Sequence, residues 1–97
     1  MGEAPAIDPE EFAVFEIKKG EKLREAMNRW TQSTGYEMVW QPKPEDGDVR
    51  FAANMEFSGT FSEAARDFFS VVRAQTKFDG RLHSNRVLRI FVANAKQ

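Results

Sequence analysis

Hydrophobic residues recur along the first third of the chain with two different spacings. Residues 12–19 are rich in Phe, Val and Ile and predict a first strand, which Gly20 ends. Residues 21–34 carry apolar side chains at the spacing of one helical stripe. These are Leu23, Ala26, Met27 and Trp30. Gly35 is the type of residue that commonly ends a helix, so a strand followed by an amphipathic helix is predicted.

Two segments in the middle of the chain alternate between apolar and polar residues. Residues 36–40 predict a second strand and residues 49–57 a third, because side chains on a strand alternate between two faces. The Pro-rich and acidic segment 42–48 between them predicts an exposed turn. We therefore expect the third strand to pair back on the second.

A second helix is predicted for residues 61–76. Thr60 and Glu63 have the spacing of a capping box at its start. Its apolar stripe consists of Phe61, Ala64, Ala65, Phe68 and Val72. After it, Asp79 and Gly80 predict a turn, and residues 81–83 and 87–93 predict a hairpin. On its second strand, Leu88, Ile90 and Val92 alternate on one face.

The predicted order is β-α-β-β-α-β-β, an α+β class in which two helices pack on a small mixed sheet. A chain of 97 residues falls within the size of one domain. We assign residues 12–93 to that domain, residues 1–11 to a disordered leader or linker, and residues 94–97 to a tail. No apolar run is long enough for a membrane span.

The residue types that usually carry catalysis are scarce. The chain has no cysteine, which excludes disulfides and thiolate chemistry, and its single histidine, His83, is too few for a typical zinc site. Ser84 and Asp79 lie close to His83 in the sequence, but neighbours in a hairpin do not converge as a triad does. The glycines are spread one to a turn, unlike a phosphate-binding loop. The sequence predicts no enzyme, no metal and no cofactor.

The net charge of −1 is unevenly distributed. Residues 1–60 carry seven Lys or Arg against twelve Asp or Glu, whereas residues 61–97 carry seven against three. In a compact domain this difference predicts two faces of opposite sign, which suits association with a partner or head to tail with a second copy. The alternative is that both sets of charges are ordinary solvated surface.

The predicted element order is also that of RNA-recognition domains. Such domains present aromatic residues on a strand with a glycine-containing basic motif. Residues 48–57 lack a glycine after Arg50 and carry Asp48 and Glu56, which would repel phosphate. RNA binding, through a local patch of Lys77, Arg81, Arg86 and Arg89, is therefore a minor alternative, and no nucleic acid partner is expected.

Four segments resemble the C-terminal domain of the toxin co-regulated pilus biosynthesis protein Q family. They are GEKLREAMNRW (20–30), GYEMVW (35–40), FSGTFSEA (57–64) and NRVLRI (85–90). The layout is also similar to that of the short N-terminal domain of secretins and TonB-dependent transducers. The resemblance implies a periplasmic domain without catalysis or cofactor that contacts an outer-membrane secretin or another pilus or secretion component. A signalling domain of the transducer type is the main alternative.

The expected mode of binding follows from the small sheet, whose edge strands have free backbone groups that can pair with a partner strand. We expect the last strand to be such an edge, with Val87, Arg89 and Phe91 facing outward. Trp30 lies on a helix stripe and is expected in the core. Trp40 ends a strand beside prolines, where an exposed aromatic side chain can anchor a partner.

Overall fold

The structure is a computed structural model and describes residues 8–93. Its elements are β1 (Ala13–Ile17), α1 (Leu23–Thr34), β2 (Glu37–Trp40), the short 3-10 helix η1 (Pro44–Asp46), β3 (Met55–Gly59), α2 (Phe61–Gln75), β4 (Phe78–His83) and β5 (Val87–Val92). This order confirms the predicted α+β class and both predicted helices. The predicted tail, 94–97, lies outside the described residues.

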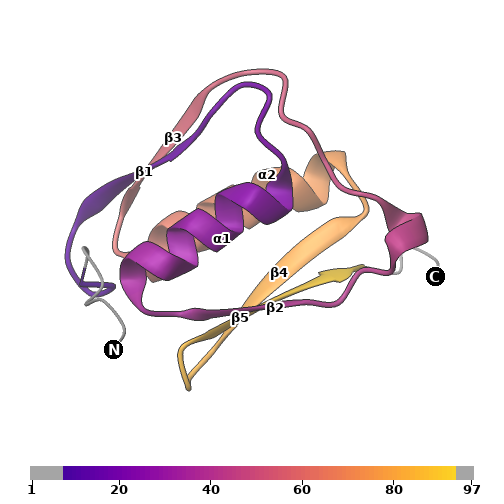
Figure 1. The fold of residues 1–97 in the computed structure, drawn as a ribbon. Coiled ribbons are helices and arrows are strands. Elements are labelled where there is room, and N and C mark those ends of the chain that lie inside the picture. Colours follow the sequence, from indigo (N-terminus) through magenta and orange to yellow (C-terminus); the bar gives the residue numbers. More distant parts are fainter. Residues whose placement is uncertain (1–7, 94–97) are drawn as a thin grey trace.

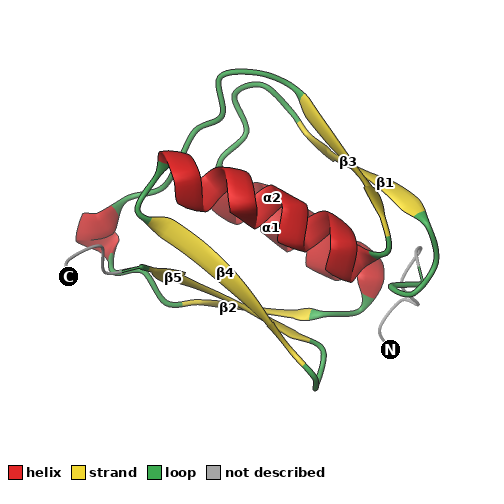
Figure 2. Ribbon diagram, turned by 180° about the vertical axis from the view of Figure 1, so that it is seen from behind, coloured by secondary structure: helices red, strands yellow, loops and turns green. Residues whose placement is uncertain are grey.

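The two helices lie between two separate sheets (Figure 1). On one side, β1 and β3 form an antiparallel ribbon with Phe15 opposite Phe57. On the other side, β5 is the central strand of a three-stranded sheet, parallel to β2 and antiparallel to β4 (Figure 2). The helices thus have an apolar neighbour on both sides, which explains the large share of aromatic residues in the core.

The predicted pairing of the third strand with the second is wrong, because β3 pairs with β1. The strand is also shorter than predicted and begins at Met55. The segment before it is held by the turn that follows β1: Gly20 N–H donates to the Phe51 carbonyl at 2.7 Å, and Phe51 N–H donates to the Glu21 carbonyl at 2.9 Å. Val49 and Phe51 pack against the core, so their alternation reflects burial of a connecting segment and not a long strand.

The prediction that the last strand forms an edge is also wrong. β5 has a hydrogen-bonded neighbour on each side, and the edges of this sheet are β2 and β4. The predicted turn at Asp79 and Gly80 is part of β4, which begins at Phe78. Arg89 thus lies at the centre of the sheet, between Val39 on β2 and Arg81 on β4.

Trp30 is the centre of the core and is 1 % exposed, as predicted. Its ring lies 5.2 Å from that of Phe15 in the ribbon and 5.1 Å from that of Phe68 on α2. Its indole N–H donates to the Glu16 carbonyl at 3.0 Å. One side chain thus joins α1, α2 and β1.

The chain packs against α2 before the predicted start of the domain at Phe12. Pro9 is buried, and its carbonyl accepts a hydrogen bond from Phe61 N–H at 2.9 Å. Residues 1–7 of the predicted leader lie outside the described residues, so their disorder stays a prediction.

The predicted capping box at the start of α2 is present. Glu63 N–H donates to Thr60 Oγ1 at 3.2 Å, and Thr60 N–H donates to Glu63 Oε1 at 3.0 Å. Gly59 precedes it with a φ of 131°, and a Cβ at Gly59 would lie 2.6 Å from Glu63 Oε1. The glycine therefore leaves room for the carboxylate that closes the box.

Replacing Thr60 with alanine is expected to lower the free energy of unfolding by about 1 kcal/mol, because the Glu63 N–H loses its acceptor. Chemical denaturation followed by circular dichroism measures this change. Ser70→Ala, on the exposed face of the same helix, is the control and should cost nothing. Equal stability of the Thr60 variant and the parent would contradict the role of the cap.

Candidate functional site

The residues nearest to a catalytic triad do not form one. His83 and Ser84 are exposed, and Asp79 is bound to Arg73, whose Nη1 lies 3.0 Å from Asp79 Oδ1. Within residues 8–93, no group of His, Asp and Glu side chains is arranged to hold a metal ion.

Three of the four predicted partner-binding residues share one surface. Val87, Arg89 and Phe91 face away from the helices, because Leu88 and Ile90 between them are buried in the core. Val39 lies beside Arg89 on the neighbouring strand. We call Val39, Val87, Arg89 and Phe91 the open sheet face. Both helices lie on the opposite side of this sheet (Figures 1 and 2).

Arg89 contacts neighbours on both sides of β5. Its guanidinium lies 4.5 Å from the centre of the Phe91 ring, and its Nη1 donates to Gln41 Oε1 at 3.0 Å. Its Nε lies 3.4 Å from His83 Nε2. Arg81 lies opposite Arg89 on β4, and Glu37 lies opposite Val87 on β2, so the three apolar side chains of this face are flanked by charged side chains of both signs.

Trp40, the fourth predicted residue, lies on the other side of the sheet. It pairs with the buried Ile90, and its ring stacks on that of Phe78 with centres 6.0 Å apart. The Arg24 guanidinium covers it at 5.3 Å. Trp40 is half-buried against the core and does not belong to the open sheet face. The partner-binding role of all four residues stays a prediction.

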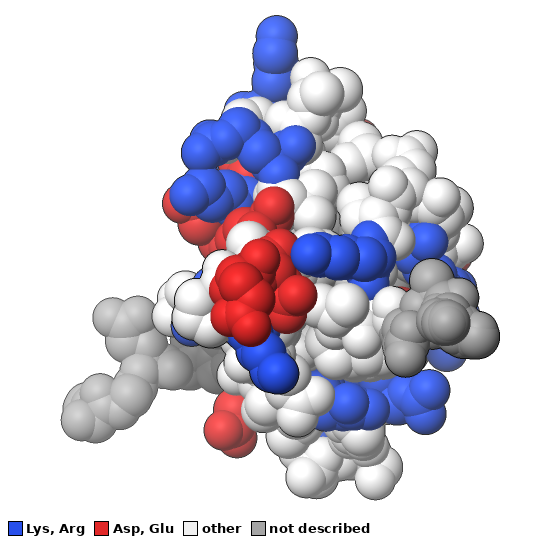
Figure 3. Space-filling model, turned by 90° about the vertical axis from the view of Figure 1, so that its right-hand side faces the viewer, with Lys and Arg blue, Asp and Glu red and all other residues white. Residues whose placement is uncertain are grey.

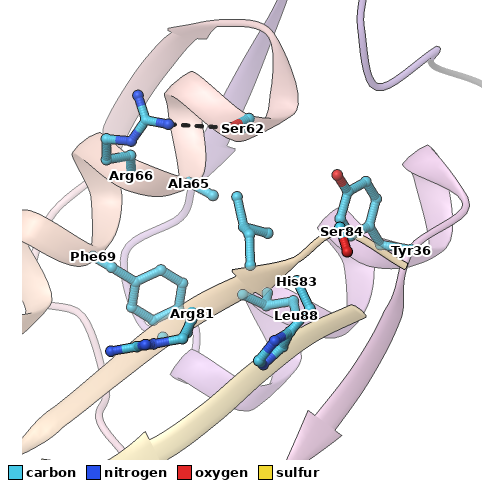
Figure 4. A pocket seen from close by; sticks show the side chains of 11 residues that line it. Tyr36, Ser62, Ala65, Arg66, Phe69, Arg81, His83, Ser84 and Leu88 are labelled. Atoms are coloured by element: carbon cyan, nitrogen blue, oxygen red, sulfur yellow. Dashed lines mark hydrogen bonds between the residues drawn. The ribbon is translucent and has the colours of Figure 1, made fainter. Parts of the chain in front are cut away.

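A groove runs between α2 and β4, an edge strand (Figure 4). Its volume is about 470 Å³. Ser62, Ala65, Arg66 and Phe69 from α2 form one wall, while Arg81, Leu82 and His83 from β4 form the other. We call it the α2–β4 groove. It has an apolar floor and a basic rim.

The backbone of β4 offers free hydrogen-bonding groups to this groove. Ala93 N–H donates to the Lys77 carbonyl at 2.8 Å. Because hydrogen-bonded pairs alternate along an antiparallel ladder, the backbone groups of Phe78, Gly80 and Leu82 point away from β5. Two of these N–H groups are occupied: Phe78 N–H donates to Thr76 Oγ1 at 2.9 Å and Gly80 N–H to Asp79 Oδ1 at 2.8 Å. Leu82 N–H and the carbonyls of Gly80 and Leu82 remain at the edge.

The charges of the groove differ from those elsewhere on the molecule. On the face that Figure 3 shows, an acidic patch lies among Lys and Arg side chains, and Lys77 Nζ is 3.7 Å from Asp46 Oδ1. The predicted separation of charge is therefore incomplete on this face. In the described part of the chain, the salt bridges include neither Arg66 nor Arg81. The groove thus has two arginines without a carboxylate partner.

The groove was not predicted from the sequence. Of its basic residues, Arg81 was considered only as part of a possible RNA-binding patch. The available signal was the run of basic residues in the last third of the chain, which did not reveal that α2 and the edge of β4 lie side by side.

The arrangement of strands does not favour the RNA-binding alternative. An RNA-recognition domain stacks bases on aromatic residues of one four-stranded sheet, to which its first and third strands belong. Here β1 and β3 form their own ribbon, with Phe15 buried and Phe57 packed against the core. The side chains that would stack bases are therefore turned inward.

Neither α1 nor α2, the helices of residues 8–93, is long and apolar enough to cross a membrane. Comparison with curated proteins and with solved structures gave no significant match. A family model, described as toxin co-regulated pilus biosynthesis protein Q, matches residues 13–92, which span β1 to β5. The chain therefore belongs to the toxin co-regulated pilus biosynthesis protein Q family, and is an accessory protein related to pilus biogenesis.

Proposed function

We propose that this domain is a non-catalytic protein-binding module of the periplasm that attaches to an outer-membrane secretin or to a neighbouring component of a type IV pilus machine. The observation that carries the proposal is the open sheet face, a sheet surface without a helix over it on which Val39, Val87 and Phe91 lie beside Arg89, in a chain of a pilus-biogenesis family. Aromatic and arginine side chains are the residues most enriched at the energetic centres of protein interfaces.

The remaining features of the domain support a binding role. The apolar interior is filled by closely packed aromatic rings, with Phe61 and Phe68 fully buried beside Trp30. Within the described residues, every buried side-chain nitrogen and oxygen atom has a hydrogen-bond partner. The three-stranded sheet has two edge strands, β2 and β4, whose backbone groups can pair with a partner strand.

Capture of envelope proteins tests the proposal. The 97-residue chain, immobilised and exposed to a detergent extract of the envelope of its own bacterium, is expected to retain the secretin or another pilus component, identified by mass spectrometry. Val87→Glu together with Phe91→Glu should lower this capture about tenfold, because two carboxylates interrupt an apolar interface. Failure to retain any pilus or secretin component would contradict the proposal.

A matched control separates loss of the surface from added negative charge. Gln32→Glu together with Ser70→Glu places two carboxylates on exposed helix positions away from the sheet. This variant should capture as much as the parent chain. If both variants capture equally, the open sheet face is not the contact, even where the partner is a secretin.

A further inference from the structure

We infer that the α2–β4 groove binds an extended acidic segment of a partner protein, which adds to β4 as a further strand. The inference rests on the proposed protein-binding function and specifies the chemistry of a second contact. The groove lies at the β4 edge of the sheet and is walled by α2, and it adjoins the open sheet face at Arg81, which lies opposite Arg89.

The backbone of β4 determines that the segment is extended. Leu82 N–H and the carbonyls of Gly80 and Leu82 form a row with the repeat of a strand, and a partner strand pairs with such a row through its own backbone. The Phe78 and Gly80 N–H groups are occupied by nearby side chains, as natural proteins often arrange at exposed edges. The open stretch around Leu82 coincides with the groove.

The walls of the groove determine the side chains of the segment. Successive side chains of an added strand point alternately to the two faces of the sheet. On the helix side they meet Ala65, Phe69 and Leu82, which favours apolar side chains of moderate size. On the opposite side they meet the exposed Arg81, which favours a carboxylate.

The charges around the groove exclude a basic segment. Arg66 lies at the helix rim and Arg81 at the strand rim, and their nearest acidic neighbours in sequence are already engaged or outside the groove. Asp79 binds Arg73, Glu63 accepts from Thr60 N–H, and Asp67 does not line the groove. A partner carboxylate would therefore complete an ion pair that the domain leaves open, and a lysine would be repelled.

The test uses the 97-residue chain and a capped peptide of alternating Glu and Val, as long as β4. Addition of the peptide is expected to shift the amide resonances of Gly80 and Leu82. Arg66→Glu together with Arg81→Glu should weaken binding at least about tenfold, as should replacement of Glu by Lys in the peptide. Lys18→Glu together with Lys19→Glu, exposed at the far end of β1, is the control and should bind as the parent does.

Three results would overturn the inference. The first is no binding at millimolar peptide, and the second is equal binding by the groove variant, whose fold is checked by its unfolding midpoint. The third is self-association that the groove variant abolishes, because the occupant would then be a second copy of the chain. The proposed function is judged separately: capture of a secretin that the groove variant leaves unchanged retains the function and removes this site, and peptide binding without capture does the reverse.

Discussion

Replacing Trp30 with alanine is expected to lower the free energy of unfolding by about 3–5 kcal/mol, the usual cost of removing a large buried aromatic side chain. Trp30 is 1 % exposed and contacts rings on two other elements. The substitution also leaves the Glu16 carbonyl without the indole N–H that donates to it at 3.0 Å. Because a domain of this size has a total stability of about 5–15 kcal/mol, this loss is a large fraction of the total.

Trp40→Ala is the matched control for this experiment. Trp40 is half-buried beside Phe78, so its removal opens a site that water can fill, and the expected cost is below about 2 kcal/mol. Urea unfolding followed by far-ultraviolet circular dichroism compares the two without relying on tryptophan fluorescence. If both variants lose the same stability, Trp30 is not the centre of the core.

The second large effect is expected at Gly80, where alanine should destabilise the domain by about 1–3 kcal/mol through overpacking. A Cβ at this position would lie 2.5 Å from Cζ of Phe69, which is itself buried. The sign of this change in stability is informative, because replacing a glycine in the interior of a strand with alanine normally stabilises a protein. The measurement is again the free energy of unfolding in urea.

A double variant shows whether the cost comes from this contact. Phe69→Leu removes the ring atoms that the new Cβ would meet, so Gly80→Ala should cost less in that background than in the parent chain. Additive effects of the two substitutions would contradict direct contact. Both residues line the α2–β4 groove, so the missing side chain at Gly80 leaves room for the Phe69 ring on the groove floor.

The binding predictions depend on features that differ in how far the sequence revealed them. Val87, Arg89 and Phe91 were recognised as one outward face, because the alternation with Leu88 and Ile90 holds whether the strand is central or at an edge. Trp40 was grouped with them only by its position near prolines. Its partners, Phe78 and Arg24, come from distant segments that no local pattern connects to it.

The local structure of this protein could be predicted from the sequence: two amphipathic helices with their buried stripes, the cap at Thr60, the end of α1 at Gly35 and the α+β order. These features follow from spacing and side-chain chemistry within a few residues. Strand pairing, in contrast, depends on contacts between distant segments. The alternation in residues 49–57 does not specify a partner strand. In the structure β3 pairs with β1, and the two strands form the layer on the side of the helices opposite the three-stranded sheet. The α2–β4 groove likewise depends on the strand order, because β5 lies at the centre of its sheet and β4 lies at the edge beside α2.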